Sequence, residues 1–336
     1  MRSSLALVPD ADDAFSASVT ERLDAVESRI REVVATSDDM VRWTARHLLD
    51  AGGKRVRPLL TLLAGSFGDM SRDAVIDAAV LVELTHLATL YHDDVMDDAP
   101  TRRGARTAHE VWSNSVAILT GDFLFARASA LSSTLGPEAV LIHAETFERL
   151  CLGQLHETVG PSPEDDPFAH YLSVLADKTA SLIASAGRLG ALQAGCDPAV
   201  ADVFARYGEK VGVAFQLADD VLDLRSDPET SGKAPGTDLK EGVPTMPTLL
   251  VRRRAASPEA DPRTGRLVSL LDAARDGGPV LDEALALLRE DEAVEETAAM
   301  ARSLGAEAVA ILEDLPATPG RAALIDFTHA LIDRAA

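Results

Sequence analysis

The sequence of 336 residues has few cysteines, aromatic side chains and lysines, and it lacks long uninterrupted apolar runs. The two cysteines, Cys151 and Cys196, show neither a CxxC motif nor a metal-binding spacing, so a cytoplasmic protein without disulfides is expected. No apolar run approaches the length of a membrane span, and the stretch that ends at Pro9 is too short for a signal peptide. Stable membrane insertion is therefore not expected.

Positive charge is also scarce, and the formal net charge is −22. Such a surface argues against nucleic acid and against an anionic membrane as electrostatic partners. It leaves room for a small anionic substrate, because a local basic pocket can form on an acidic protein. With 46% hydrophobic and only 4% aromatic residues, the core should consist of Ala, Leu and Val, a composition that favours helices.

Helical periodicity recurs along nearly the whole chain, and the alternating β-branched runs that would indicate strands are absent. Glycine and proline breakers, such as those at residues 52–53 and 277–279, separate the predicted helices. We expect helices over residues 19–50, 71–92, 108–134, 137–158, 168–194, 198–224, 245–255, 265–275, 279–290, 292–314 and 319–335. The prediction is a single all-α domain over residues 16–336, preceded by a flexible acidic tail over residues 1–15.

Two aspartate clusters stand out in this helical pattern, DDVMD at residues 93–97 and DDVLD at residues 219–223. On a helix, positions i and i+4 share a face, so each cluster should bring several carboxylates into one small volume. A cation relieves the repulsion between such carboxylates, and an all-oxygen ligand set suits Mg²⁺ together with substrate phosphates. The two clusters therefore predict a magnesium-bridged cage for a polyphosphate.

Basic residues flank these clusters. The segment GGKRVRP at residues 52–58 joins two glycines to three cations, a combination that fits phosphate binding, with capping of a helix C-terminus as the alternative. Arg102 and Arg103 follow the first cluster and could bind phosphate or pair with nearby aspartates at the surface. Residues 225–247, which follow the second cluster and include Lys233, are rich in Gly, Pro, Asp and Thr, and they predict a lid rather than a plain connector.

His86 lies seven residues before Asp93, about two helical turns away and on the same face as the aspartates. This placement favours a role at the site over ordinary packing. Gln216 precedes the second cluster on one predicted helix and could hydrogen-bond a substrate. The other histidines and both tryptophans are expected to serve packing or the surface.

Several motifs occur together in one order. They are GGKRVRP at 52–58, ELTHLATLYHDDVMDDAPTRRG at 83–104, GDFLFA at 121–126, DKTASL at 177–182, FQLADDVLD at 215–223 and GKAPGTDL at 232–239. Over roughly residues 20 to 335, the chain resembles the trans-type polyprenyl (isoprenyl) diphosphate synthases. The resemblance implies an all-α helix bundle of the isoprenoid synthase type around a central substrate cavity, and a homodimer that uses three Mg²⁺ ions.

The resemblance also implies roles for single residues. The metal ions on the allylic diphosphate would be bound by Asp93, Asp94, Asp97, Asp219 and Asp220. Asp223 would contact these ligands and not the metal itself. The allylic diphosphate and the reacting centre would be contacted by Arg102, Lys178, Thr179, Gln216 and Lys233. Isopentenyl diphosphate would be held by Lys54, Arg57, His86 and Arg103. Many family members carry a lysine where this chain has Val243, so the diphosphate is held by one cation fewer, or Lys240 takes that place.

The implied reaction is Mg²⁺-dependent head-to-tail condensation of an allylic diphosphate with isopentenyl diphosphate. In this family the residue five positions before the first aspartate sets the depth of the tunnel, and here it is Ala88. With Thr89 beside it, the small Ala88 side chain predicts a long all-trans product of C30 to C50. Phe123 and Phe125 would instead supply a deeper floor and give a geranylgeranyl or farnesyl product. A long oily product suggests transient membrane contact during its release.

Three further classes fit less well. A class I terpene cyclase would normally carry an NSE/DTE-like second metal motif and an aromatic cavity, whereas the second motif here is DDxxD. A non-catalytic partner subunit would tend to lose aspartates that this chain keeps. A di-iron bundle needs repeated Glu-x-x-His pairs, and Glu83 with His86 is only one such pair.

Overall fold

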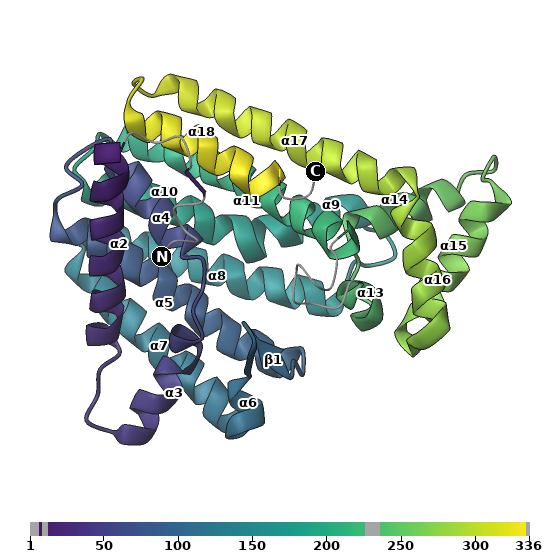
Figure 1. Cartoon of the computed structure of the whole chain (residues 1–336), viewed down its shortest axis with the longest axis horizontal. Coiled ribbons are helices and arrows are strands. Elements are labelled where there is room, and N and C mark those ends of the chain that lie inside the picture. The colour runs from purple at the N-terminus through teal and green to yellow at the C-terminus, as the bar shows by residue number, and fades with distance from the viewer. Residues whose placement is uncertain (1–6, 9–12, 226–235, 334–336) are drawn as a thin grey trace. The chain divides into compact units, whose positions relative to one another are not determined.

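The computed structural model describes residues 7–8, 13–225 and 236–333. It is almost entirely helical, as predicted (Figure 1). The chain divides into two compact units. Unit 1 comprises residues 1–150, 181–209 and 310–327, and unit 2 comprises residues 151–180, 210–309 and 328–336. Four helices contribute residues to both units: α8 (Pro137–Val159), α11 (Pro198–Arg225), α17 (Glu292–Ile311) and α18 (Pro319–Ile332).

Unit 1 is built around the long helix α5 (Asp73–Met96). Besides α5 and its parts of the four shared helices, it contains α2 (Asp13–Val33), α3 (Asp39–Asp50), α4 (Val56–Gly65), β1 (Thr101–Arg102), β2 (Ala105–Arg106), α6 (Ala108–Val111), α7 (Asn114–Thr134), α10 (Ser181–Gln193) and the short turn η3 (Leu312–Asp314). Helix α5 packs against α2, α4, α7 and α10. It is long and apolar enough to cross a membrane, but 67% of its most apolar stretch is buried inside the protein, as expected for a central core helix.

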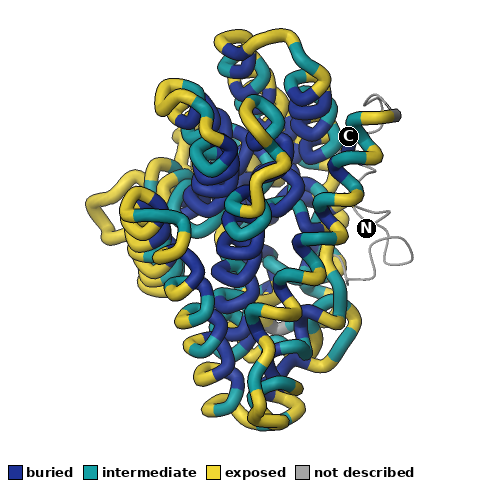
Figure 2. The backbone as a smooth tube through the Cα atoms, turned by 90° about the vertical axis from the view of Figure 1, so that its left-hand side faces the viewer, coloured by how far each residue is buried: buried dark blue, intermediate teal, exposed yellow. Residues whose placement is uncertain are grey.

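Helices approach closely where glycine faces backbone. A Cβ atom at Gly190 of α10 would lie 2.2 Å from the carbonyl oxygen of Thr61 on α4, so only glycine permits this contact. A Cβ atom at Gly121 of α7 would lie 3.1 Å from the carbonyl oxygen of Ala88 on α5. Glycine therefore allows close backbone packing between α4 and α10 and between α5 and α7. Buried residues run through the helices, and exposed residues lie at the turns and on the outward faces of helices (Figure 2).

Unit 2 contains shorter helices. They are α9 (Pro167–Leu175), the π-helical turn η1 (Ala176–Ala180), α13 (Thr237–Glu241), α14 (Met246–Ala255), α15 (Pro262–Ala273), the 3₁₀ turn η2 (Ala274–Asp276) and α16 (Gly278–Arg289). Helix α9 begins with the favoured sequence of a capping Asp166 and a proline at its first position, and the Asp166 carboxylate accepts from Phe168 N–H at 3.1 Å. Helix α14 packs on α9 and on α15.

Several predicted boundaries were wrong. The helix predicted over 19–50 is two helices, because the chain leaves α2 after Val33 and Asp38 caps α3 by accepting from Val41 N–H at 3.0 Å. Helix α2 begins at Asp13, inside the predicted tail. The sequence interpretation missed α4. It also missed the antiparallel hairpin of β1 and β2, two strands of two residues each. The predicted helix 108–134 is interrupted at Ser113, whose side chain caps α7 by accepting from Val116 N–H.

Candidate active site

The first aspartate cluster occupies the C-terminal end of α5. Asp93 and Asp94 lie in its last turn, and Asp97 is the residue that ends it, with its N–H bonded to the carbonyl of Asp93 at 2.8 Å. Carboxylates are unfavourable at a helix C-terminus, where the helix dipole is negative. A bound cation would relieve this arrangement, because it would be attracted by both the carboxylates and the helix end.

Asp94 is the buried member of this cluster, with 1% of its side chain exposed. Its Oδ1 accepts a hydrogen bond from Arg102 Nε at 2.7 Å, whereas its Oδ2 is buried and has no hydrogen-bond partner among the described residues. Burial raises the pKa of the Asp94 carboxyl, and the nearby Arg102 guanidinium opposes that rise. An unpartnered buried carboxylate oxygen is costly, and a hard cation such as Mg²⁺ is a ligand that would satisfy it.

The hairpin after α5 places its two arginines differently. Arg102 pairs with the buried Asp94 and not with the exposed Asp97 and Asp98, which follow Asp94 in the sequence. Arg103 adopts φ +54° in the turn and donates to the carbonyl oxygens of Gly52 and Leu48, the latter at 3.2 Å. The guanidinium of Arg103 also fills the space beside Gly53, where a Cβ atom would lie 2.9 Å from it. Gly53 thus allows the hairpin arginine to approach the basic loop.

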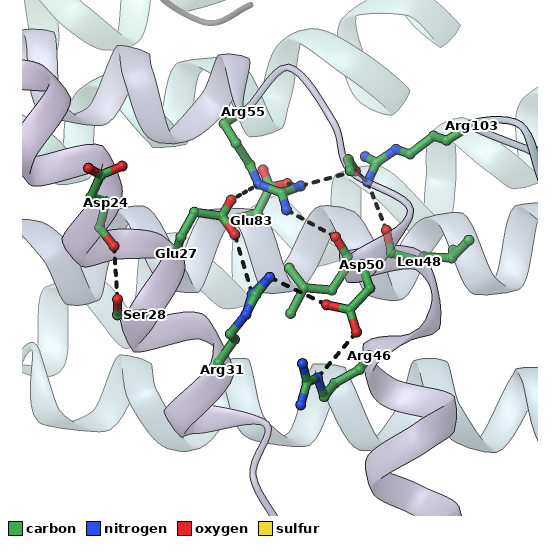
Figure 3. A network of polar contacts seen from close by, with 12 residues as sticks. Asp24, Glu27, Ser28, Arg31, Arg46, Leu48, Asp50, Arg55, Glu83 and Arg103 are labelled. Carbon is green, nitrogen blue, oxygen red and sulfur yellow. Dashed lines mark hydrogen bonds and ion pairs between the residues drawn. The ribbon is translucent and has the colours of Figure 1, made fainter. Parts of the chain in front are cut away.

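The basic loop 52–58 contains one structural cation. Arg55 is 6% exposed and bonds to Glu83 at 2.9 Å and to Glu27 of α2, which also pairs with Arg31 (Figure 3). The left-handed backbone of Arg55, with φ +48°, starts α4. Arg55 therefore fixes the loop between α2, α4 and α5, and its charge is already neutralised by two carboxylates.

The other cations of this loop remain candidates for anion binding. Lys54 is exposed, and Arg57 is half-buried with no hydrogen-bond partner for its Nε atom in the part of the chain that the structure describes. Burial lowers the pKa of Arg57 to about 10, so it is still charged at neutral pH. A buried guanidinium nitrogen without a partner is suited to an incoming phosphate oxygen.

His86 lies in the same positive region, on α5 two turns before Asp93. Burial lowers the pKa of its imidazole well below the ordinary value, and four guanidinium groups lower it further. These groups belong to Arg57, Arg103, Arg102 and Arg55. The same arginines that lower the pKa of His86 would attract an anion, which the imidazole can hydrogen-bond. The structure thus gathers three of the four residues predicted for isopentenyl diphosphate around one point of α5.

The second aspartate cluster lies near the C-terminal end of α11. Asp219 and Asp223 are half-buried, whereas Asp220 is 5% exposed. Asp220 Oδ2 accepts from Tyr171 Oη at 2.5 Å and from the N–H of Met246 at 2.9 Å. Burial raises the pKa of Asp220 to about 8, and these two donors oppose the rise. Sequence reasoning missed Tyr171, which stands seven residues before Lys178 without any motif of its own.

Lys178 and Thr179 lie on the π-helical turn η1, between α9 and α10. Single π-helical turns occur frequently at functional sites because they displace side chains from the regular helical positions. Lys178 pairs with Glu157 of α8, so an incoming diphosphate would have to compete with this carboxylate. Close packing at Gly153, where a Cβ atom would lie 2.7 Å from the backbone nitrogen of Lys178, fixes the turn against α8.

The remaining predicted residues are less informative. Gln216 is half-buried on α11. Lys233 and residues 226–235 of the predicted lid lie outside the described residues. Val243 follows the short helix α13, and its N–H bonds to the carbonyl of Asp238 at 2.9 Å, while Lys240 is exposed.

The residues predicted to set product length lie on α5 and α7. Ala88 is 1% exposed and Thr89 is half-buried. Phe125 packs on Phe147 of α8, with ring centroids 3.7 Å apart, and stacks on His143 at 5.1 Å. Phe123 instead lies beneath the guanidinium of Arg127. The structure therefore places Phe125, but not Phe123, in a cluster of half-buried Phe125 and Phe147 with buried His143. Phe147 is the member that the sequence interpretation missed.

In residues 7–8, 13–225 and 236–333, no three acidic, histidine or cysteine side chains converge tightly enough to hold a metal by themselves. The predicted cluster of carboxylates in a small volume is thus not preformed within either motif. Even so, the residues fit a divalent cation, since the donors are all carboxylates and Asp94 Oδ2 is buried with no partner within these described ranges. A bound diphosphate would supply further oxygen ligands.

The helical fold and the diphosphate-suited site define the isoprenoid synthase class, and the comparisons agree. The family model for polyprenyl synthetase matches residues 38–271. The chain is 42% identical over 321 residues to nonaprenyl diphosphate synthase of Mycobacterium tuberculosis, covering 94% of both proteins. The chain belongs to the polyprenyl synthetase family.

Two solved structures resemble this fold closely. Geranylgeranyl pyrophosphate synthase from Corynebacterium glutamicum, complexed with calcium and isoprenyl diphosphate, has a TM-score of 0.83 at 39% identity, over 96% of this chain and 98% of that one. Polyprenyl synthase from Caulobacter crescentus, complexed with the same ligands, has a TM-score of 0.87 at 33% identity, over 97% and 99%. The enzyme is thus a trans-polyprenyl diphosphate synthase.

Proposed function

We propose that the protein condenses an allylic diphosphate with isopentenyl diphosphate, head to tail, to give a long-chain all-trans polyprenyl diphosphate of C30 to C50. The observation that carries this proposal is the arrangement on α5, where His86 among four arginines lies two turns before Asp93 and Asp94. One helix thus offers a metal-independent anion site and a metal-binding motif. A terpene cyclase, which handles one diphosphate, would have no use for the first.

The residues divide the work between the two substrates. Arg57 and His86, with Lys54 and Arg103, hold the diphosphate of isopentenyl diphosphate. The aspartates of the two motifs would bind the three Mg²⁺ ions that accompany the allylic diphosphate. Arg102, Lys178 and Lys233 would also contact this diphosphate, beside Thr179 and Gln216. When bound, magnesium neutralises charge on the diphosphate leaving group. Lys178 adds a positive charge there once it has exchanged Glu157 for the substrate.

The reaction itself needs no protein base. The allylic C–O bond breaks, and its electron pair leaves with the diphosphate. The double bond of isopentenyl diphosphate then forms the new C–C bond to the allylic carbon, and a proton is lost to the departed diphosphate. The protein's part is to orient both substrates and to exclude water, which would quench the cation.

Product length follows from the small residue near the first motif and from the relatives. Ala88 gives little bulk at its position, and the curated relative from Mycobacterium tuberculosis is named for a nonaprenyl product. A geranylgeranyl product is the second candidate, because the solved relative from Corynebacterium glutamicum bears that name. In that case Phe125, packed on Phe147, would form the floor.

The assembly that we propose is a cytoplasmic homodimer. Large apolar side chains are exposed on α7 and α8, among them Leu119 at 65% and Leu141 at 57%. Such residues on neighbouring helices are typical of a surface that a second subunit covers. Substitution of Leu119 and Leu141 by Arg should give a monomer in light scattering, and an unchanged mass would reject this face as the interface.

The test of function is incubation with Mg²⁺, labelled isopentenyl diphosphate and farnesyl diphosphate, followed by sizing of the dephosphorylated products. Products of C30 to C50 support the proposal. A stop at C20 keeps the reaction and assigns the floor to Phe125 and its neighbours. Cyclic or hydrolysed products without elongation would reject the synthase.

A further inference from the structure

One carboxylate of the second motif joins three elements of unit 2. Asp220 on α11 receives hydrogen bonds on its Oδ2 atom from Tyr171 on α9 and from the N–H of Met246, the first residue of α14. All three groups are buried, with Tyr171 9% and Asp220 5% exposed. Because both donors use the same oxygen, they fix the plane of the carboxylate, and neither of them engages Oδ1.

The helix that carries Tyr171 leads into the turn that carries two residues proposed to bind the allylic diphosphate. Helix α9 runs directly into the π-helical turn η1, where Lys178 follows Tyr171 by seven residues. Packing of α14 on α9 supports this connection independently of the hydrogen bonds. The Tyr171 hydroxyl therefore links the turn that bears Lys178 to the helix that bears the second motif.

Hydrogen bonds behind a metal-binding carboxylate usually orient it and tune its affinity. The bond from Tyr171 is short, and it is made to an acceptor that is charged when it binds a cation, so it is stronger than an ordinary neutral pair. A phenylalanine ring would fill nearly the same space and lose only this donor. The hydroxyl, not the ring, is thus the group whose role can be isolated.

We propose that Tyr171 is a positioning residue, which orients Asp220 for a divalent cation and couples the Lys178 turn to the second motif. This inference rests on the proposed function, because it assigns Asp220 to the metal that accompanies the allylic diphosphate. Tyr171 itself touches neither substrate nor metal in this assignment. It acts through Asp220 alone, so loss of its hydroxyl should have no effect when Asp220 is absent.

The experiment measures Mn²⁺ binding by electron paramagnetic resonance in the presence of inorganic diphosphate, using the full-length Tyr171→Phe protein. Loss of an orienting partner typically weakens metal binding about 10- to 100-fold, and we expect a change of this size. The KM for isopentenyl diphosphate should stay unchanged, while the Mg²⁺ concentration needed for half-maximal activity rises. Tyr171→Phe in an Asp220→Ala background should have no further effect on Mn²⁺ binding.

Tyr207→Phe is the matched control, since the Tyr207 hydroxyl is also buried but donates to the carbonyl of Leu324 at 3.3 Å. It should leave Mn²⁺ binding unchanged. Should Tyr171→Phe not fold, Met246→Pro removes the other donor at a helix-start position that accepts proline, and it should weaken Mn²⁺ binding in the same direction. Unchanged Mn²⁺ affinity in a folded Tyr171→Phe protein would overturn the proposal. Because the wild-type elongation assay is separate, that outcome leaves the proposed function standing.

Discussion

Arg102 and Asp94 form an unequal pair: Arg102 Nε donates to one oxygen of the carboxylate at 2.7 Å, while the other oxygen is buried and has no partner in the part of the chain that the structure describes. The pair thus holds Asp94 in place and leaves Oδ2 as a ready ligand. A cation at that oxygen would offset the cost of burying it. The same arginine that was predicted to contact substrate therefore also orients Asp94, which we propose as a metal ligand.

Asp94→Asn should lower kcat/KM by about 10²- to 10³-fold, because charge stabilisation at the leaving group is lost. The control is Asp98→Asn, whose side chain is 98% exposed and lies outside the DDxxD pattern. Elongation assays with both variants, at matched helical content, decide the matter. Comparable losses in both proteins would show that general surface charge, and not a metal ligand, was removed.

In the basic loop, we expect Arg57 to contribute to substrate binding and Arg55 to contribute to the stability of the fold. Arg57→Ala should raise the KM for isopentenyl diphosphate at least about tenfold, since an ionic hydrogen bond to a phosphate is lost. Arg55→Ala should instead lower the free energy of unfolding by about 3–5 kcal/mol, because it leaves Glu83 buried without its partner. Substrate kinetics and urea denaturation of both variants test this division. The same KM effect from both, with equal stability, would contradict it.

The sequence was sufficient for the fold class and for the aspartate motifs because their patterns are local. Helix α4 was missed since nearly all its residues are buried, and an apolar run without a polar face carries no helical periodicity. The break before α3 could have been read from Asp38, a capping residue. Sequence alone could not separate Arg55 from Arg57, because burial against Glu27 and Glu83 depends on contacts between distant segments.

Product length should respond to the size of residue 88. Ala88→Phe should shorten the main product by several isoprene units, because the bulky ring would obstruct the growing chain. Ala88→Ser, which changes the volume little, should leave the product distribution as in the wild type. The measurement is chromatographic sizing of dephosphorylated products at equal turnover. An unchanged distribution in Ala88→Phe, with normal folding, would remove Ala88 from the length-setting residues and favour Phe125 with Phe147.

Stability at mildly acidic pH should depend on His143. Burial lowers the pKa of this imidazole to about 4, well below the value near 6.5 expected in the unfolded chain. Above pH 6.5 both states are neutral and the stability is complete. As the pH falls from 6.5 towards 4, only the unfolded state binds the proton, so up to about 3 kcal/mol is lost.

The measurement is urea denaturation at pH 7 and pH 4.5 of the wild type and of His143→Gln, which cannot take up the proton. Titration of carboxylates affects both proteins, so the difference between their pH dependences isolates His143. The variant should lose less stability on acidification. Its stability at pH 7 should be lower than that of the wild type, because the stack with Phe125 and the contact with Ser129 at 3.2 Å are weakened. Parallel pH profiles would mean that His143 is already protonated or accessible to water in the folded protein.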